Sequence, residues 1–311
     1  MQQPISSVTV LAPKVSAGQV IPEVLPLTEQ KAIPSTGLRV LQISPHPDDE
    51  LIGAPATLMA LRDAGWEIAN YAVSLGRSQD WARRQKELEK ACRRARFRLI
   101  LPMDPLPISP DDDLQWAEDE LVQRLLRYIP SYDIVFSPSP HDRHHGHEVV
   151  ARAVRRALES INTPPRWWMW GLWGELPLPN ILTHFSKKRL DEIVYALEAH
   201  AGELERNDYR RLVQGRAWAT SVLGPERVFG FNSRATAGEY AEVVSEVVRR
   251  QGTWLLGSAR HLNLTTPISD QPTNIDIGFW LSALSLTTKI QLVTKDLLED
   301  LFIRGPSGDN N

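Results

Sequence analysis

The chain has 311 residues, of which 42% are hydrophobic, and a formal net charge of −3 at pH 7. This length is sufficient for one large α/β core, and the charge excludes a general cationic field that would favour nucleic acid or an anionic membrane surface. The single cysteine, Cys92, excludes an intramolecular disulfide and an all-cysteine metal site, and it favours a reducing, cytoplasmic setting.

The two ends of the chain show little periodic pattern. Residues 1–37 are rich in Pro, Ser, Val and Gln and predict an extended arm, without the basic start and apolar stretch of an export signal. No window supplies the roughly 20 apolar residues that a membrane-spanning helix needs. We therefore expect an arm over residues 1–37, one domain over residues 38–250, and a C-terminal extension of that domain over residues 251–311 with a frayed end.

Apolar runs alternate with amphipathic stretches from residue 38 onward. The predicted strands cover residues 38–44, 67–75, 98–101 and 133–137. The predicted helices cover about 49–64, 81–95, 115–129 and 147–161. This alternation predicts an α/β fold, a Rossmann-like and mostly parallel sheet with helices on both faces.

The pattern weakens after about residue 162. Residues 166–173 predict an aromatic strand or loop, and helices are predicted over residues 187–206 and 237–250. In a parallel α/β sheet the active site lies beyond the carboxyl ends of the strands, and two unusual motifs fall at such ends.

The first motif, His46-Pro47-Asp48-Asp49-Glu50, follows the first predicted strand. The two prolines that flank His46 favour extended backbone, which leaves its ring free to bind. Carboxylates at a helix start also complement the helix dipole, so ordinary capping is the alternative to a metal site. Neighbouring Asp side chains on a helix diverge, so one can bind a metal while the other faces a metal-bound water. The turn lacks G-x-G-x-x-G, which argues against a dinucleotide cofactor.

The second motif follows the fourth predicted strand and contains four of the eight histidines: His141, His144, His145 and His147. A polar, solvated loop is the alternative to a ligand cluster. A catalytic zinc usually has three protein ligands and one open position. We therefore predict His46, Asp49 and His147 as ligands, Asp48 as general base, and His144 as acid or oxyanion stabiliser. Such ligands suit Zn²⁺ and also accept Fe²⁺, Co²⁺ or Mn²⁺.

These motifs resemble those of the PIG-L/LmbE-like family of zinc-dependent N-deacetylases. The family's (A/S)HPDDE motif is similar to residues 45–50, and its D-x-H-P-D-H motif is similar to residues 142–147. Weaker similarities are R-x-x-E at residues 84–87 and Tyr-Ala-Glu at residues 240–242. The resemblance covers about residues 37–250 and implies a Rossmann-like sheet, Zn²⁺ and the same site roles. It further implies that Arg84 contacts the substrate.

One position departs from the family pattern. Gly146 replaces an Asp that, in the family, helps to hold the catalytic His in its charged form. Asp142 or Glu148 is the expected substitute. Among the four tryptophans of residues 167–173, Trp170 is the predicted substrate wall, with core packing as the alternative. The arginines along residues 83–98 predict the solvated face of an amphipathic helix.

The function expected from these observations is removal of an N-acetyl or N-acyl group from an amino sugar or its conjugate, such as a glycolipid, a pseudo-disaccharide or an antibiotic-like molecule. A metal-containing sugar- or lipid-binding module with little activity is one alternative, motivated by Gly146. An amidase of thiol conjugates is another. The expected partner is thus a small amino-sugar-like molecule and not nucleic acid, and a homo-oligomer is possible.

Overall fold

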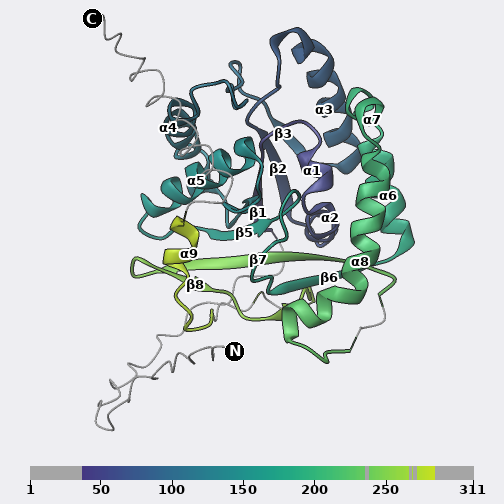
Figure 1. Ribbon diagram of the computed structural model, residues 1–311, viewed down its shortest axis with the longest axis vertical. Coiled ribbons are helices and arrows are strands. Elements are labelled where there is room, and N and C mark those ends of the chain that lie inside the picture. Colours follow the sequence, from purple (N-terminus) through teal and green to yellow (C-terminus); the bar gives the residue numbers. More distant parts are fainter. Residues whose placement is uncertain (1–36, 235–237, 266–267, 269–271, 284–311) are drawn as a thin grey trace, which may run out of the picture. The chain divides into compact units, whose positions relative to one another are not determined.

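The computed structural model of the protein describes residues 37–234, 238–265, 268 and 272–283. Except for Gly37, the predicted arm lies outside the described residues, as does the end of the predicted C-terminal extension. Within the described residues, nine strands form a sheet in the order β3-β2-β1-β4-β5-β7-β6-β9, with β8 paired to β7 (Figure 1).

Five neighbouring strands form the parallel part of the sheet. They are β1 (Arg39–Ser44), β2 (Glu67–Ala72), β3 (Arg98–Ile100), β4 (Ile134–Pro138) and β5 (Arg166–Trp170). In the centre, Val40 of β1 pairs with Ile68 of β2 and Ile134 of β4. Both faces of β1, β2, β4 and β5 are buried, which explains their largely apolar sequences, whereas the edge strand β3 is only partly buried.

Helices cover both faces of this sheet, and the predicted fold class is therefore confirmed (Figure 1). One face packs against α1 (Asp49–Ile52), α2 (Pro55–Asp63), α3 (Trp81–Ala95), α6 (Lys187–Leu197) and α8 (Tyr209–Phe229). The other face packs against α4 (Leu114–Leu125), α5 (His145–Glu159) and α9 (Gly278–Ser282). Because β1 and β4 are neighbours whose following helices lie on opposite faces, a crevice opens beyond their carboxyl ends.

The predicted helix over residues 237–250 is wrong. These residues contribute β7 (Tyr240–Arg250), which pairs antiparallel with β5, β6 (Ile181–Phe185) and β8 (Thr253–Leu256). Val244 and Val247, three residues apart, are buried on opposite faces of the sheet. The β-branched valines of this segment suit such a two-sided strand.

The helices after β6 also differ from prediction. The helix predicted over residues 187–206 is divided into α6 and α7 (Ala201–Arg206), and β9 (Arg260–His261) follows later in the chain. The long helix α8 was not predicted, because Gly215, Gly224 and Pro225 interrupt its apolar pattern. In the part of the chain that the structure describes, no helix has both the length and the apolar character needed to cross a bilayer.

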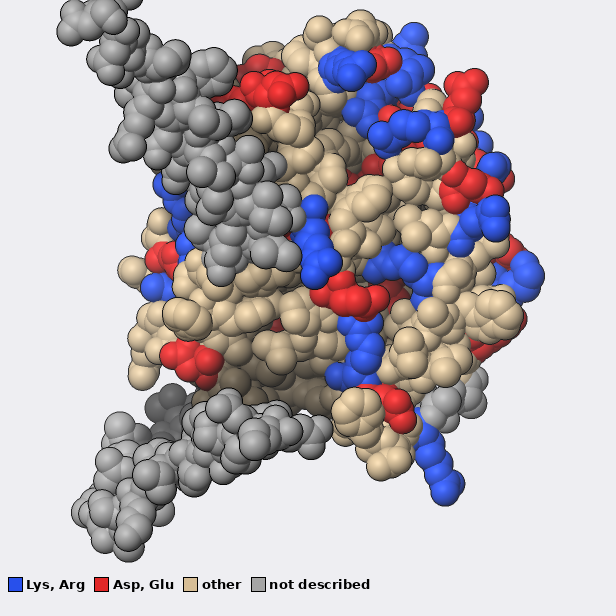
Figure 2. Space-filling view, viewed as in Figure 1, with Lys and Arg blue, Asp and Glu red and all other residues tan. Residues whose placement is uncertain are grey.

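The basic side chains around α3 lie among acidic ones, as the sequence predicts. Figure 2 shows basic and acidic side chains interspersed over the end of the molecule where Figure 1 places α3. Arg83 pairs with Glu87 at 2.8 Å, and Arg96 pairs with Asp63 at 2.7 Å. These exposed pairs describe a solvated surface rather than a polyanion site.

Candidate active site

The two motifs meet beyond the carboxyl ends of β1 and β4. Asp49 Oδ2 lies 3.3 Å from His46 Nδ1 and 3.4 Å from His147 Nε2. A tetrahedral zinc ion with nitrogen and oxygen ligands at about 2.0–2.1 Å would separate its ligand atoms by about 3.3–3.4 Å. Both distances therefore match edges of such a tetrahedron.

His144 lies in the same cluster. Ring nitrogens of His46, His144 and His147 are all within 4.8 Å of one another. The three histidines can thus hold a divalent metal, and Asp49 Oδ2 lies close to two of them. The predicted ligand set and the three-histidine set share His46 and His147, and in both cases the donor chemistry suits zinc.

Asp142 supports the cluster from behind. Its Oδ2 lies 2.6 Å from Nδ1 of His147, which leaves Nε2 directed toward Asp49. Its Oδ1 accepts hydrogen bonds from the backbone N–H groups of Leu172, Trp173 and Gly174. A carboxylate bound to the far nitrogen of a histidine fixes the ring for metal binding. The sequence did not predict this role for Asp142.

The electrostatics of the cluster favour a bound cation. Burial disfavours a charged His147, yet Asp49 and Asp142 raise its pKa from 6.5 to about 10. Burial likewise would raise the pKa of Asp49, but His147 and His46 lower it far below its usual value. A divalent ion at His147 Nε2 would meet the same two negative carboxylates, so the residues fit a metal.

Asp48 stands beside the ligands in an unusual backbone conformation. It precedes α1 with φ 112° and ψ −27°, although positive φ is rare for residues other than glycine. Its N–H donates to Glu50 Oε2 at 3.1 Å, and Glu50 Oε1 lies 2.6 Å from His200 Nε2. Both Glu50 and His200 are fully buried, so this pair fixes the turn from beneath. Backbone strain of this kind concentrates at functional sites.

Burial raises the pKa of Asp48 well above its usual value. The neighbouring carboxylates of Asp49, Glu203 and Glu50 add to the shift, while Arg84 opposes it. A carboxyl group whose pKa is raised in this way is better matched to proton transfer near neutral pH than an ordinary aspartate.

His144 is surrounded by aromatic rings. Its ring stacks on His145 at 4.4 Å and on Trp173 at 5.9 Å between centroids. Burial, followed by the charges of His147, His46 and His145, lowers its pKa to about 2. This shift favours the neutral form of the ring.

Close packing around Gly146 explains why this chain has no carboxylate at the family position beside His144. A Cβ atom on Gly146 would lie 3.1 Å from His46 Cε1 and 3.2 Å from Ile108 Cδ1. An aspartate there would push His46 away from the cluster. Asp142, the expected substitute, is hydrogen-bonded to His147 and the backbone, and Glu148 Oε1 accepts from the N–H of Arg143 at 3.1 Å.

A cavity of about 570 Å³ opens over this cluster. His46, Asp48, Asp49, His144 and His147 all line it, so the predicted catalytic and metal-binding residues are brought together. Arg84 lines it too, with Nη2 2.6 Å from Glu203 Oε1 and Nη1 donating to Leu75 O at 3.1 Å. Glu203, from α7, is a cavity residue that no local motif in the sequence indicates.

The two nearby tryptophans are placed differently. Trp170 is fully buried, packs edge-on against His147 at 5.3 Å between centroids, and lies against Gly53. Trp173 is 50% exposed and lines the cavity wall. The predicted substrate wall at Trp170 is therefore covered by other atoms, whereas Trp173 is accessible. Its place between two glycines just after β5 is the sequence signal for an exposed turn.

A Rossmann-like sheet with a histidine–aspartate cluster at the switch point defines the class of the protein as an α/β protein with a candidate metal centre. Residues 41–158 match the family model described as PIG-L: GlcNAc-PI de-N-acetylase. Both motifs fall within this match, so the resemblance to the PIG-L/LmbE-like family is confirmed over these residues.

Solved structures share the fold. The zinc-inhibited form of teicoplanin deacetylase Orf2 is 18% identical, with a TM-score of 0.51 over 68% of this chain and 99% of that chain. The A40926 pseudoaglycone deacetylase Dbv21 is 16% identical, with a TM-score of 0.52 over 67% of this chain and 96% of that chain. A deacetylase–bog complex from the teicoplanin pathway is 19% identical, with a TM-score of 0.52 over 68% and 99%.

Proposed function

We propose that the chain is a metal-dependent hydrolase, with zinc as the expected ion, that removes an N-acetyl or N-acyl group from an amino sugar or its conjugate. The proposal depends chiefly on one observation: Asp49 Oδ2 lies 3.3 Å from His46 Nδ1 and 3.4 Å from His147 Nε2, and Asp48 lines the same cavity. The family model names a de-N-acetylase, and two of the similar structures are named as a teicoplanin deacetylase and an A40926 pseudoaglycone deacetylase. These names support an amide of an amino sugar as the substrate class.

His46, Asp49 and His147 would hold the ion, which would polarise the amide carbonyl and lower the pKa of a bound water. Asp48 accepts the proton of the attacking water, whose oxygen bonds to the carbonyl carbon. The C–N bond then breaks, and the same proton passes from Asp48 to the leaving nitrogen. The products are a free amine and a carboxylic acid.

His144 contributes a hydrogen bond rather than a full charge. Its neutral ring lies next to His46 and His147, with centroids 5.1 and 4.6 Å away, so it can donate one N–H to the developing oxyanion. Trp173 offers its exposed face to a sugar ring. Arg84 is held by Glu203, so we assign it to positioning the cavity wall near Asp48.

The function is tested by metal removal and an amine-release screen. Dialysis against a chelator should abolish release of free amine from N-acetylated sugars, glycolipids or thiol conjugates, and Zn²⁺ or another divalent ion should restore it. Binding of a sugar without amine release would favour the binding-module alternative, which the neutral His144 and Gly146 motivate. Release from thiol conjugates alone would favour the amidase alternative.

A further inference from the structure

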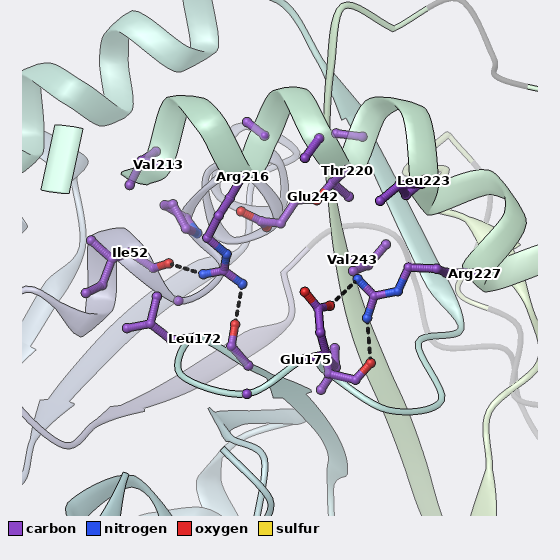
Figure 3. A pocket seen from close by; sticks show the side chains of 18 of the residues that line it. Ile52, Leu172, Glu175, Val213, Arg216, Thr220, Leu223, Arg227, Glu242 and Val243 are labelled. Carbon is purple, nitrogen blue, oxygen red and sulfur yellow. Dashed lines mark hydrogen bonds and ion pairs between the residues drawn. The ribbon is translucent and has the colours of Figure 1, made fainter. Parts of the chain in front are cut away.

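A second cavity, of about 390 Å³, adjoins the candidate active site. Ile52, Leu172 and Trp173 line both cavities and mark the border between them. Figure 3 shows this cavity beneath α8, with β7 and the turn after β5 on its other sides. The roles proposed above make no use of it.

The central charged group of this cavity is Arg216. Its guanidinium extends from α8 into the cavity and donates to the carbonyl oxygens of Ile52, at 3.3 Å, and Gly171 (Figure 3). Within the described part of the chain, its hydrogen bonds go to neutral carbonyl groups and not to a carboxylate. Burial lowers the pKa of Arg216 even though Asp142, Glu242 and Glu175 lie near enough to raise it. A cation in these surroundings lacks a contacting counter-charge.

The neighbouring acid does not supply that charge. Glu242 lines the cavity, but its two carboxylate oxygens accept from the N–H groups of Ala56, at 3.1 Å, and Thr57, at 2.8 Å. These N–H groups belong to the first turn of α2, which thereby takes up the negative charge. Burial also raises the pKa of Glu242.

Two further arginines reinforce the positive potential. Arg227 lines the cavity from α8 and pairs with Glu175, whose side chain is 88% exposed, at 2.8 Å (Figure 3). Arg143 lines the cavity from the turn before α5. Three arginines therefore face two glutamates, one of which is capped by a helix.

We propose that this second cavity binds an anionic group of the substrate, a carboxylate or a phosphate, with Arg216 as its principal partner. The inference rests on the function proposed above, because the amide would lie at the histidine cluster and the anion across the border marked by Ile52, Leu172 and Trp173. The planar fork of a guanidinium matches the paired oxygens of either anion. The buried apolar side chain of Val213 also lines the cavity and lowers the local dielectric constant, which strengthens the attraction. The expected substrates are thus N-acylated sugar acids or sugar phosphates.

The anion site is tested without turnover by titrating inorganic phosphate, and separately acetate, into the full-length protein in a calorimeter. Phosphate, acetate or both should bind, and Arg216→Gln should weaken that binding at least ten-fold. The matched control Arg210→Gln, on the same helix but paired with Asp208 at the surface, should change it less than two-fold. His46→Ala should retain it, which separates this cavity from the metal centre. Absence of binding, or equal binding by Arg216→Gln, overturns the proposal.

Because Arg216 also holds two backbone carbonyls, Arg227→Gln provides a second variant whose partner is exposed. It should weaken anion binding about three-fold or more while its melting temperature stays within 2 °C of the parent. No effect in either folded variant overturns the proposal. Comparing phosphate with acetate shows whether the site prefers a phosphate or a carboxylate, since the better-bound probe identifies the anion class.

A further experiment compares the binding affinity of N-acetylglucosamine with those of N-acetylglucosamine 6-phosphate and N-acetylmuramic acid. At least one charged sugar should bind more than ten-fold tighter than the neutral one, and Arg216→Gln should reduce that ratio to below three. Equal binding of neutral and charged sugars would overturn the inference. Amine release from the neutral sugar alone would leave the proposed function standing, so the two failures are distinguishable.

Discussion

Oδ2 of Asp142 lies 2.6 Å from Nδ1 of His147, so a single carboxylate orients one of the candidate metal ligands. Asp142→Asn should weaken zinc binding about 10- to 100-fold, because the amide no longer favours the ring state that presents Nε2 to a metal. A competition titration with a chromophoric chelator measures this change. Asp104→Asn, at an exposed surface pair with Arg124, is the control and should not alter zinc affinity. Unchanged affinity in Asp142→Asn would show that the carboxylate is dispensable.

Asp48→Asn tests the general base without disturbing the backbone. Asparagine tolerates positive φ as well as aspartate does, so the turn at φ 112° should persist and zinc should still bind. Turnover should fall about 100- to 10,000-fold, because the amide cannot accept the proton of the attacking water. Initial rates of amine release with a parallel metal analysis check both expectations. Asp113→Asn, at the start of α4, is the matched control. Full activity in Asp48→Asn would refute the assigned role.

Gly146→Ala tests the close packing behind His46. The added methyl group would lie 3.1 Å from the ring, so the ring must shift, at a cost of about 1–3 kcal/mol. Zinc affinity should therefore fall about 5- to 100-fold, and Gly146→Asp should lower it at least as much instead of restoring the family pattern. Gly215→Ala is the control, since a methyl group there meets open space. Stronger zinc binding or faster turnover in Gly146→Asp would contradict this explanation.

The two tryptophans should separate stability from substrate binding. Trp170→Ala removes a fully buried ring and should destabilise the fold by about 3–5 kcal/mol in urea unfolding. Trp173→Ala removes a half-exposed ring and should leave the unfolding midpoint nearly unchanged while raising KM for the sugar about five-fold or more. A normal KM in Trp173→Ala would remove this side chain from the substrate wall.

A buried carboxylate far from the site predicts the response of stability to acid. Burial would raise the pKa of Glu246, but Arg260 and Arg166 lower it below 4.5. Its charge therefore stabilises the fold above pH 4.5, and this contribution disappears as the pH falls through the lower folded-state pKa. Glu246→Gln removes the buried negative charge that both arginines contact and should cost about 3–5 kcal/mol at pH 7.

The difference in unfolding free energy between parent and Glu246→Gln should narrow between pH 5 and pH 3, measured by urea unfolding at each pH. Glu89→Gln, on the exposed face of α3, should show no such pH-dependent difference. A difference in unfolding free energy that stays constant down to pH 3 would mean that Glu246 is not the titrating group.

The local sequence pattern was sufficient to predict the parallel half of the fold and the histidines and aspartates that meet at the site. The helix predicted over residues 81–95 is present as α3, and Leu88, Ala91, Cys92 and Ala95 form its buried stripe, because a helix on a sheet exposes only its other face. Glu203 and Arg216 were not predicted, because each reaches its cavity through a tertiary contact with a distant segment. No spacing within their own helices signals such contacts.

The antiparallel half shows where periodicity fails. In β7, pairs of apolar residues at 243–244 and 247–248 fit a helix repeat as well as a strand buried on both faces. Pairing with β5 and β6 decides in favour of the strand, and the paired residues of those strands lie more than 50 positions away in the chain. Trp170 and Trp173 show the same limitation, since Trp170 ends a buried strand and Trp173 lies in the turn that follows.

The second oxygen of Asp142, bonded to three successive amides of residues 172–174, has a consequence for how this scaffold can vary. An insertion within that turn would misalign the amides and release the carboxylate that orients His147. Length changes compatible with catalysis must therefore begin after Gly174, at the solvent-facing Glu175. New specificities on this framework should arise by exchanging the side chains at Leu172 and Trp173, not by lengthening the turn that carries them.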